Sequence, residues 1–241
     1  MRAVLFDFAG TLFSDRDLRD AHLDQLRFVA RAAGVEATDG ELRAAYRRGM
    51  GVAYRAVAVA PSYSHRTLFA AAFTATAVAL GGSIDEATAD EAVDRQYRAT
   101  IDGAVLRPDC LDTLAALRRM SIHVQVVSNI DDEQIGPLLD RLGLIDVIDV
   151  IDAWTSSEEA GSCKPDPAIF HLALAKAGCG PEQALFVGDS IRHDIEGPAA
   201  LGMRTAWLPP RATSDPGDAR PDHVIHALGD VLDLVDLGVL R

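Results

Sequence analysis

The chain has 241 residues, of which 49% are hydrophobic and 24% charged, a balance typical of a water-soluble globular protein with a substantial core. Its formal net charge of −13 argues against non-specific binding to nucleic acid or to an anionic membrane, so we expect neither partner. The three cysteines are odd in number and lack CxxC spacing, which favours neither a disulfide framework nor a zinc site.

The apolar segments predict neither a secretory signal nor a membrane span. The first apolar run carries an acidic residue, Asp7, in its middle, which is unlike a signal sequence. The longest run, residues 68–82, is shorter than the ~20 residues that a span needs, and threonines interrupt it. We therefore expect a cytoplasmic protein.

Residues 2–7 form a short apolar run with aromatic and β-branched members, which predicts a buried strand. The segment that follows, to about residue 100, is rich in alanine and has helical periodicity with almost no strand signal. Gly34 is expected to end its first helix, and Thr38 is a candidate N-cap of the second. The four predicted helices span residues 17–34, 38–51, 62–82 and 84–101.

After residue 107 the pattern becomes a regular alternation of helices and strands. The predicted helices span residues 111–120, 131–143, 167–178 and 194–202. The predicted strands span residues 122–129, 147–154, 184–190, 204–209 and 222–228, with a surface loop over 209–222. Because strands that alternate with helices pair in a parallel sheet, we expect an α/β core. The core is discontinuous: it comprises residues 1–14 and 105–241, and residues 15–104 are a helical insertion.

Polar side chains stand at the carboxyl ends of several predicted strands or in the loops that follow them. They are Asp7, Ser128, Asn129, Lys164, Asp189 and Asp194. Ligands of an open parallel sheet bind outside the carboxyl ends of its strands. We therefore expect these side chains to meet at one site, where carboxylates, a hydroxyl, an amide and one of only two lysines in the chain would face a ligand.

Four motifs hold these residues: DFAGTLF (7–13), VVSN (126–129), CKPDP (163–167) and GDSIRHD (188–194). Their types and order resemble those of the haloacid dehalogenase superfamily of hydrolases, in the subgroup with an α-helical cap of the C1 type after the first strand. The resemblance implies a Rossmann-like parallel sheet as the core and residues 15–104 as the cap. The last motif, with its second aspartate, is especially typical of the magnesium-dependent phosphatases of this superfamily.

The resemblance implies a nucleophile and a Mg²⁺ cofactor. Asp7 is the implied nucleophile, which forms an aspartyl-phosphate. Mg²⁺ prefers hard oxygen ligands, and those implied here are Asp7, Asp189 and the backbone carbonyl of Ala9, with Asp194 in support. Since position 9 gives only its carbonyl to the metal, alanine leaves that ligand in place.

The remaining motif residues are implied to handle the phosphoryl group of a small phosphorylated metabolite. Ser128 hydrogen-bonds the phosphoryl group, and Asn129 helps to position it. Lys164 balances the negative charge of the site, and Thr11 orients the nucleophile loop. Phosphoryl transfer needs these parts because its catalysis consists mostly of positioning and charge neutralisation.

Ala9 is the point at which the sequence departs from most phosphatases of this superfamily. They carry a second aspartate there, which protonates the leaving oxygen and then activates water. Positioned proton transfer is typically worth ~10²–10⁴ in rate. DxAGT resembles phosphonoacetaldehyde hydrolase, in which a cap lysine forms a Schiff base with the substrate. The similar segment 47–54 has Tyr54 at that position, and the only lysines are Lys164 and Lys176, so we disfavour carbon–phosphorus cleavage.

The 2-haloacid dehalogenase branch also lacks the second aspartate, but it usually has a tyrosine there and needs no metal. The magnesium-type motif at 188–194 therefore favours a Mg²⁺-dependent hydrolase of a small phosphorylated metabolite. The alternatives are a phosphonatase-like or dehalogenase-like hydrolase, and a protein that binds phosphate but turns it over slowly.

The predicted cap offers several side chains that could bind substrate. They could also carry out the proton transfer for which Ala9 has no acidic or basic group. They are Tyr46, Arg47, Arg48, Tyr54, Arg55 and His65. The unperturbed pKa of a histidine side chain suits proton transfer near neutral pH, which makes His65 a candidate for this task. The cap helices could also pair between chains, so we expect a monomer or a homodimer.

Overall fold

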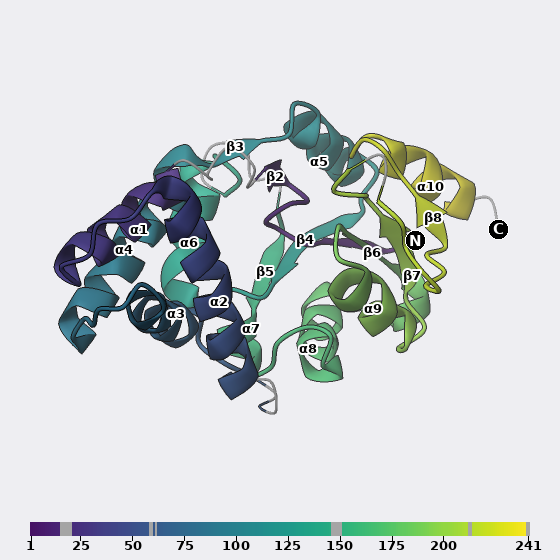
Figure 1. Ribbon diagram of the computed structural model, residues 1–241. Coiled ribbons are helices and arrows are strands. Elements are labelled where there is room, and N and C mark those ends of the chain that lie inside the picture. Colours follow the sequence, from purple (N-terminus) through teal and green to yellow (C-terminus); the bar gives the residue numbers. More distant parts are fainter. Residues whose placement is uncertain (15–20, 58–59, 61, 146–150, 212–213, 240–241) are drawn as a thin grey trace. The chain divides into compact units, whose positions relative to one another are not determined.

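The computed structural model describes residues 1–14, 21–57, 60, 62–145, 151–211 and 214–239 (Figure 1). The chain forms two compact units, one of Met1–Ser14 with Val105–Arg241 and the other of Asp15–Ala104. We call the first the core unit and the second the helical unit.

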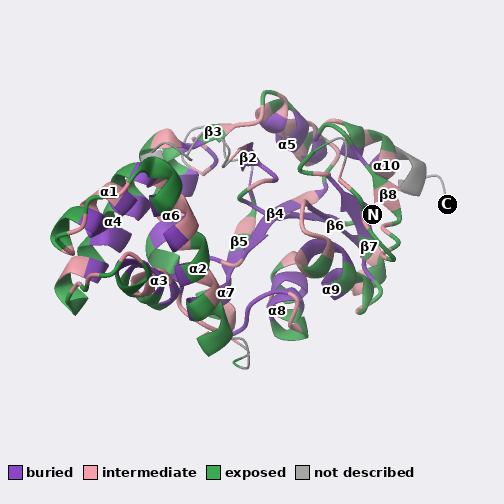
Figure 2. Ribbon diagram, viewed as in Figure 1, coloured by how far each residue is buried: buried purple, intermediate pink, exposed green. Residues whose placement is uncertain are grey.

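The core unit contains a six-stranded sheet in the order β5-β4-β1-β6-β7-β8, and each neighbouring pair runs parallel. The strands are β1 (Ala3–Phe6), β4 (His123–Ser128), β5 (Ala153–Ser156), β6 (Ala184–Gly188), β7 (Arg204–Trp207) and β8 (His223–Val224). This sheet confirms the predicted α/β, Rossmann-like core. Figure 2 shows that buried residues follow the central strands, and all four residues of β1 are fully buried.

Helices cover the two faces of this sheet, with α5 and α10 on one side and α8 and α9 on the other (Figure 1). The α-helices of the core unit are α5 (Cys110–Arg119), α6 (Asp132–Arg141), α7 (Ser157–Ala160), α8 (Pro167–Ala177), α9 (Gly197–Ala199) and α10 (Asp230–Val239). One core cluster joins Phe170 of α8 to Leu5 and Phe186 of the sheet. Burial of such side chains contributes roughly 1.5–3 kcal/mol each and fixes the helix on the sheet.

The strand predicted over 147–154 is wrong in its bounds. Residues 146–150 lie outside the described residues, and β5 begins at Ala153 and continues to Ser156. Just before this strand, the Asp152 amide donates to the Val124 carbonyl at 2.8 Å, but the Val124 amide donates to the Asp152 carboxylate, also at 2.8 Å. This side-chain bond occupies a backbone donor of β4 just before the regular pairing with β5 starts.

Two further predictions near the carboxyl end of the chain are wrong. The strand expected over 222–228 is limited to β8, because the amides of His226 and Ala227 donate to the Asp230 carboxylate and the chain turns into α10, which we did not predict. The helix expected over 194–202 begins earlier, as a π-helical segment, Ile191–Glu196, that leads into α9. A 3₁₀ turn over Pro181–Gln183 was also not predicted.

A short antiparallel ribbon lies at the ends of the helical insertion. It pairs β2 (Phe13–Ser14) with β3 (Val105–Leu106), in the register Phe13 to Leu106. Sequence patterns did not predict this ribbon, since two-residue strands carry no periodicity. It joins the point where the chain leaves the core unit to the point where it returns.

The helical unit contains α1 (Ala21–Ala32), α2 (Asp39–Val57), α3 (His65–Ala79) and α4 (Glu86–Gly103), which confirms the four predicted helices. Thr38 caps α2 as predicted: its amide donates to the Glu41 carboxylate at 2.8 Å, and its hydroxyl accepts from the Glu41 amide at 3.4 Å. The predicted end at residue 51 is too early. Glycine at position 49 does not stop the helix but permits close packing on α3, since a Cβ there would lie 2.5 Å from the Ala72 carbonyl oxygen.

Buried faces of the four helices form the core of this unit. Its main cluster includes Leu26, Leu42, Phe73, Val93 and Tyr97, one or more from each helix. Among the described helices of the chain, none is long and apolar enough to cross a membrane.

Candidate active site

Asp7 follows the central strand β1 and is 7% exposed. The hydroxyl of Thr11, which is fully buried, donates a hydrogen bond of 3.0 Å to Oδ2 of Asp7. Gly10 has a φ of +88°, and a Cβ there would lie 2.6 Å from Oδ2 of Asp189. Only glycine fits this combination of a left-handed backbone and a close approach. The loop therefore holds Asp7 and brings its own backbone against Asp189.

Lys164 is the buried cation of the site. Its ammonium donates to Oδ1 of Asp7 at 2.7 Å, to Oδ1 of Asp194 at 2.7 Å and to the Val127 carbonyl at 3.1 Å. Burial alone would lower the pKa of this ammonium, but the charges of Asp194 and Asp7 outweigh burial and raise the pKa above its usual value. Lys164 is therefore charged at neutral pH and compensates two buried carboxylates.

Asp194 is 1% exposed and sits in the π-helical segment after β6. Its second oxygen, Oδ2, accepts a hydrogen bond of 2.9 Å from the Ser190 amide. Burial raises the pKa of this carboxyl, and the Lys164 ammonium opposes that shift. Gly188 allows the approach, because a Cβ at that position would lie 2.3 Å from the Asp194 Cβ.

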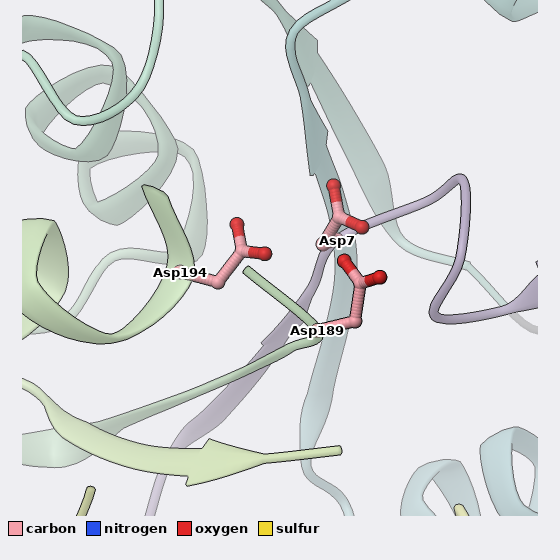
Figure 3. A group of neighbouring side chains, drawn as sticks. All are labelled: Asp7, Asp189 and Asp194. Atoms are coloured by element: carbon pink, nitrogen blue, oxygen red, sulfur yellow. The ribbon is translucent and has the colours of Figure 1, made fainter. Parts of the chain in front are cut away.

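The three aspartates come together as a candidate metal site. One carboxylate oxygen from each of Asp7, Asp189 and Asp194 lies within 4.8 Å of the others (Figure 3). Oxygen donors of this kind are the ones that Mg²⁺ prefers. Asp189 is anchored through its backbone, since the Trp207 indole donates to its carbonyl at 2.9 Å. The residues present thus fit a hard divalent cation.

Ser128 is the last residue of β4 and Asn129 follows it, at the same carboxyl edge of the sheet as Asp7. The Asn129 side chain bonds the Lys164 backbone twice: its amide donates to the Lys164 carbonyl at 3.1 Å, and its oxygen accepts from the Lys164 amide at 2.6 Å. This pair fixes the loop that carries the lysine. Ser128 is buried, 5% exposed. Ala9, in contrast, is exposed on its loop.

The candidate cap residues differ widely in their surroundings within the helical unit. Tyr46 is half-buried and stacks on Phe73, with ring centroids 5.6 Å apart, and burial raises the pKa of its hydroxyl. His65 is 8% exposed and packs between Tyr63 and Phe69. The other candidates, Arg47, Arg48, Tyr54 and Arg55, are exposed.

Three residues that the sequence interpretation did not select also contact or neighbour the site. Arg107 donates to the backbone of the loop that follows Asp7, and the Trp207 indole holds the carbonyl of Asp189. His193 precedes Asp194; burial lowers the pKa of its imidazole, and the charge of Lys164 lowers it further. The motif GDSIRHD contains His193, but no spacing rule distinguishes it from its neighbours.

The fold is that of an α/β protein with an open parallel sheet. Its carboxylates and its buried lysine lie at the carboxyl ends of the strands, where open sheets bind their ligands. A model of haloacid dehalogenase-like hydrolases matches residues 1–202. The chain belongs to this family. Phosphoglycolate phosphatase 1 of Pseudomonas aeruginosa is 32% identical over 213 residues, which cover 86% of this chain and 69% of that protein.

Other curated proteins and solved structures are also similar to this chain. The ribulose-1,5-bisphosphate 5-phosphatase of Halopiger xanaduensis is 31% identical over 150 residues, 59% of this chain and 62% of that protein. The chain spans about half the length of several other curated relatives that it matches. The magnesium-bound HAD-hydrolase YfnB of Bacillus subtilis has the same fold, with a TM-score of 0.76 and 21% identity over 98% of both chains.

Proposed function

We propose that the protein is a Mg²⁺-dependent phosphatase that transfers the phosphoryl group of a small phosphorylated metabolite to Asp7 and then to water. The environment of Asp7 carries this proposal. Its carboxylate is buried at the end of the central strand, with one oxygen held by Lys164 and the other by Thr11. A carboxylate fixed in this way is suited to attack on a bound phosphorus atom, because little reorientation is needed.

The reaction has two displacement steps. First, an oxygen of Asp7 bonds to phosphorus and the bond from phosphorus to the ester oxygen breaks, so that the alcohol leaves. Second, water attacks phosphorus, the bond to Asp7 breaks and inorganic phosphate leaves. The alkyl side chain of Ala9 donates no proton to the leaving oxygen and takes none from the water. The leaving oxygen must therefore take its proton from solvent, the substrate or another side chain. The attacking water must give up its proton to one of the same three.

The other core residues bind and orient the phosphoryl group. Ser128 donates a hydrogen bond to it, and Lys164 holds an oxygen of Asp7 through its ammonium and offsets the negative charge of the site. Asn129 acts through Lys164, since it bonds the backbone of that residue. Thr11 sets the rotamer of Asp7 through its hydroxyl.

Bound Mg²⁺ would neutralise charge on the phosphoryl oxygens. The residues suited to hold it are Asp7, Asp189 and the Ala9 carbonyl. Asp194 supports this set: its two oxygens accept hydrogen bonds from Lys164, which also holds Asp7, and from the Ser190 amide beside Asp189. The cluster of carboxylate oxygens within 4.8 Å supports this assignment.

Two matched relatives are named for phosphoglycolate and for ribulose 1,5-bisphosphate. Both compounds are small phosphate esters of metabolites, and we extend this class to the present chain. A panel that tests the proposal therefore includes both compounds, sugar phosphates, p-nitrophenyl phosphate, a phosphonate and a 2-haloacid. Release of inorganic phosphate and of halide is measured with Mg²⁺ and with EDTA.

We expect phosphate release from at least one ester, dependent on Mg²⁺ and abolished by Asp7→Asn. Asp112→Asn is the matched control, because Asp112 is an exposed aspartate on α5, and it should keep full activity. Halide release without phosphate release would replace the proposal with a dehalogenase. Tight Mg²⁺-dependent binding of phosphate with no turnover would replace it with a phosphate-binding protein.

A further inference from the structure

Arg107 is the third residue of the core unit after the helical insertion and contacts the nucleophile loop directly. Its Nε donates to the Thr11 carbonyl at 2.8 Å, and its Nη2 donates to the Gly10 carbonyl at 2.6 Å. Its backbone amide donates to the Leu12 carbonyl at 2.9 Å. One residue thus accounts for three hydrogen bonds to three consecutive carbonyls, across a sequence separation of almost one hundred residues.

The loop that Arg107 holds has demanding geometry. Gly10 has a left-handed backbone conformation and lies against Asp189. The next residue, Thr11, has to place its hydroxyl within hydrogen-bond distance of Asp7. The amides of the loop bond locally: Gly10 donates to the Phe13 carbonyl at 2.9 Å, and Thr11, Leu12 and Phe13 donate to the Phe8 carbonyl at 3.3, 2.8 and 3.5 Å. The carbonyls of Gly10 and Thr11, in contrast, accept from the Arg107 guanidinium. Rotation of the peptide groups at positions 10 and 11 would therefore move the Thr11 hydroxyl and the adjoining backbone together.

We propose that Arg107 is a positioning residue of the phosphatase reaction: it holds the two carbonyls at Gly10 and Thr11, and thereby fixes the Thr11 hydroxyl that orients Asp7. This inference rests on the proposed function. A guanidinium suits the task, because its planar fork presents donors to two neighbouring acceptors at once. A lysine at this position would carry the same charge, but its single ammonium lacks the planar pair of donors.

The position of Arg107 separates this role from general support of the fold. Within the described part of the chain, the guanidinium donates to main-chain oxygens of the loop alone, and β1 itself is fixed by β4 and β6 on its two sides. Loss of the side chain should therefore loosen residues 10–12 and leave the sheet intact. A misplacement of about 1 Å in a catalytic group costs on the order of 10²-fold in rate.

The test compares Arg107→Met, Arg107→Lys and the control Arg119→Met, an exposed arginine on α5. Two quantities are measured: amide hydrogen exchange at Gly10, Thr11 and Leu12, and steady-state kinetics on the best ester. For Arg107→Met we expect roughly 10- to 100-fold faster exchange, confined to the loop, and a kcat lower by roughly 10- to 100-fold with KM nearly unchanged. Arg107→Lys should fall between it and the wild type, and Arg119→Met should match the wild type.

The exchange measurement needs no turnover, so it keeps the inference separate from the proposed function. If no ester is hydrolysed, the proposed function fails, while faster exchange confined to the loop still supports the role of Arg107 in holding it. Unchanged loop exchange in folded Arg107→Met overturns the inference, as does an unchanged kcat. If Arg107→Met does not fold, the Lys variant decides: wild-type loop exchange and kcat would overturn the inference.

Discussion

Replacement of Lys164 by methionine removes the single ammonium that lies between two buried carboxylates. The side chain of Lys164 is 2% exposed, and its nitrogen lies 2.7 Å from both Asp7 and Asp194, whose side chains are 10% and 1% exposed. Loss of one partner from a buried ion pair costs about 3–5 kcal/mol, because the remaining charge stays desolvated. We expect Lys164→Met to lower the free energy of unfolding of the core unit by at least this amount at neutral pH.

The control is Lys176→Met, the other lysine of the chain. Lys176 also makes short contacts, at 2.6 Å to Glu159 and to the Trp154 carbonyl, but its side chain is 28% exposed. Pairs of this kind contribute about 0–1 kcal/mol. Urea unfolding followed by tryptophan fluorescence measures both variants, since the two tryptophans, Trp154 and Trp207, belong to the core unit. Equal costs for the two variants would refute the reasoning.

The pH dependence of this effect has a definite sign. The pKa of Lys164 is raised above its ordinary 10.5 in the folded protein. Its contribution to stability is therefore complete below about pH 10.5 and is lost as the pH rises further. The difference in stability between wild type and Lys164→Met should therefore shrink in solutions more alkaline than about pH 10.5.

Three further substitutions test the surroundings of Asp7. Ala9→Asp should raise phosphatase activity by up to ~10²–10⁴, most for esters with poorly acidic alcohols, and an unchanged rate in a folded, metal-binding variant would contradict this. Gly10→Ala should weaken Mg²⁺ binding in calorimetry far more than Gly202→Ala, which has similar φ (+84°) but nothing within 4 Å of its Cβ. Trp207→Phe, which removes the hydrogen bond to the Asp189 carbonyl, should cost about 1 kcal/mol in thermal unfolding, and no shift would count against that bond.

The sequence was sufficient to predict the architecture of the core because its strands are short, buried apolar runs between helices. β1, β4 and β6 have this character, and they appear in the structure within a residue or two of the prediction. The pattern failed at β5, where the Asp152 carboxylate takes the Val124 amide and the regular pairing with β4 starts only at Ala153. A side chain that competes with the backbone hydrogen bonds of a sheet does not alter the hydrophobic periodicity, so the sequence pattern cannot predict it.

The site was predictable in part for a topological reason. Parallel strands have their carboxyl ends at one edge, so Asp7, Ser128 and Asp189 had to converge there once the strands were identified. Arg107 and Trp207 were not predictable, because their partners are backbone carbonyls, which every residue possesses. The three-dimensional path of the chain alone decides which carbonyl a given side chain meets.

The most direct test of the central claim is capture of a phosphoryl group on Asp7. The protein is mixed with an ester that it hydrolyses in the presence of Mg²⁺ and quenched with acid, and its peptides are mapped by mass spectrometry. The account predicts one phosphoryl group on the peptide that contains Asp7, none after EDTA treatment and none in Asp7→Asn. Turnover of the ester by Asp7→Asn at the wild-type rate, or a phosphoryl group on any other residue, would contradict the account.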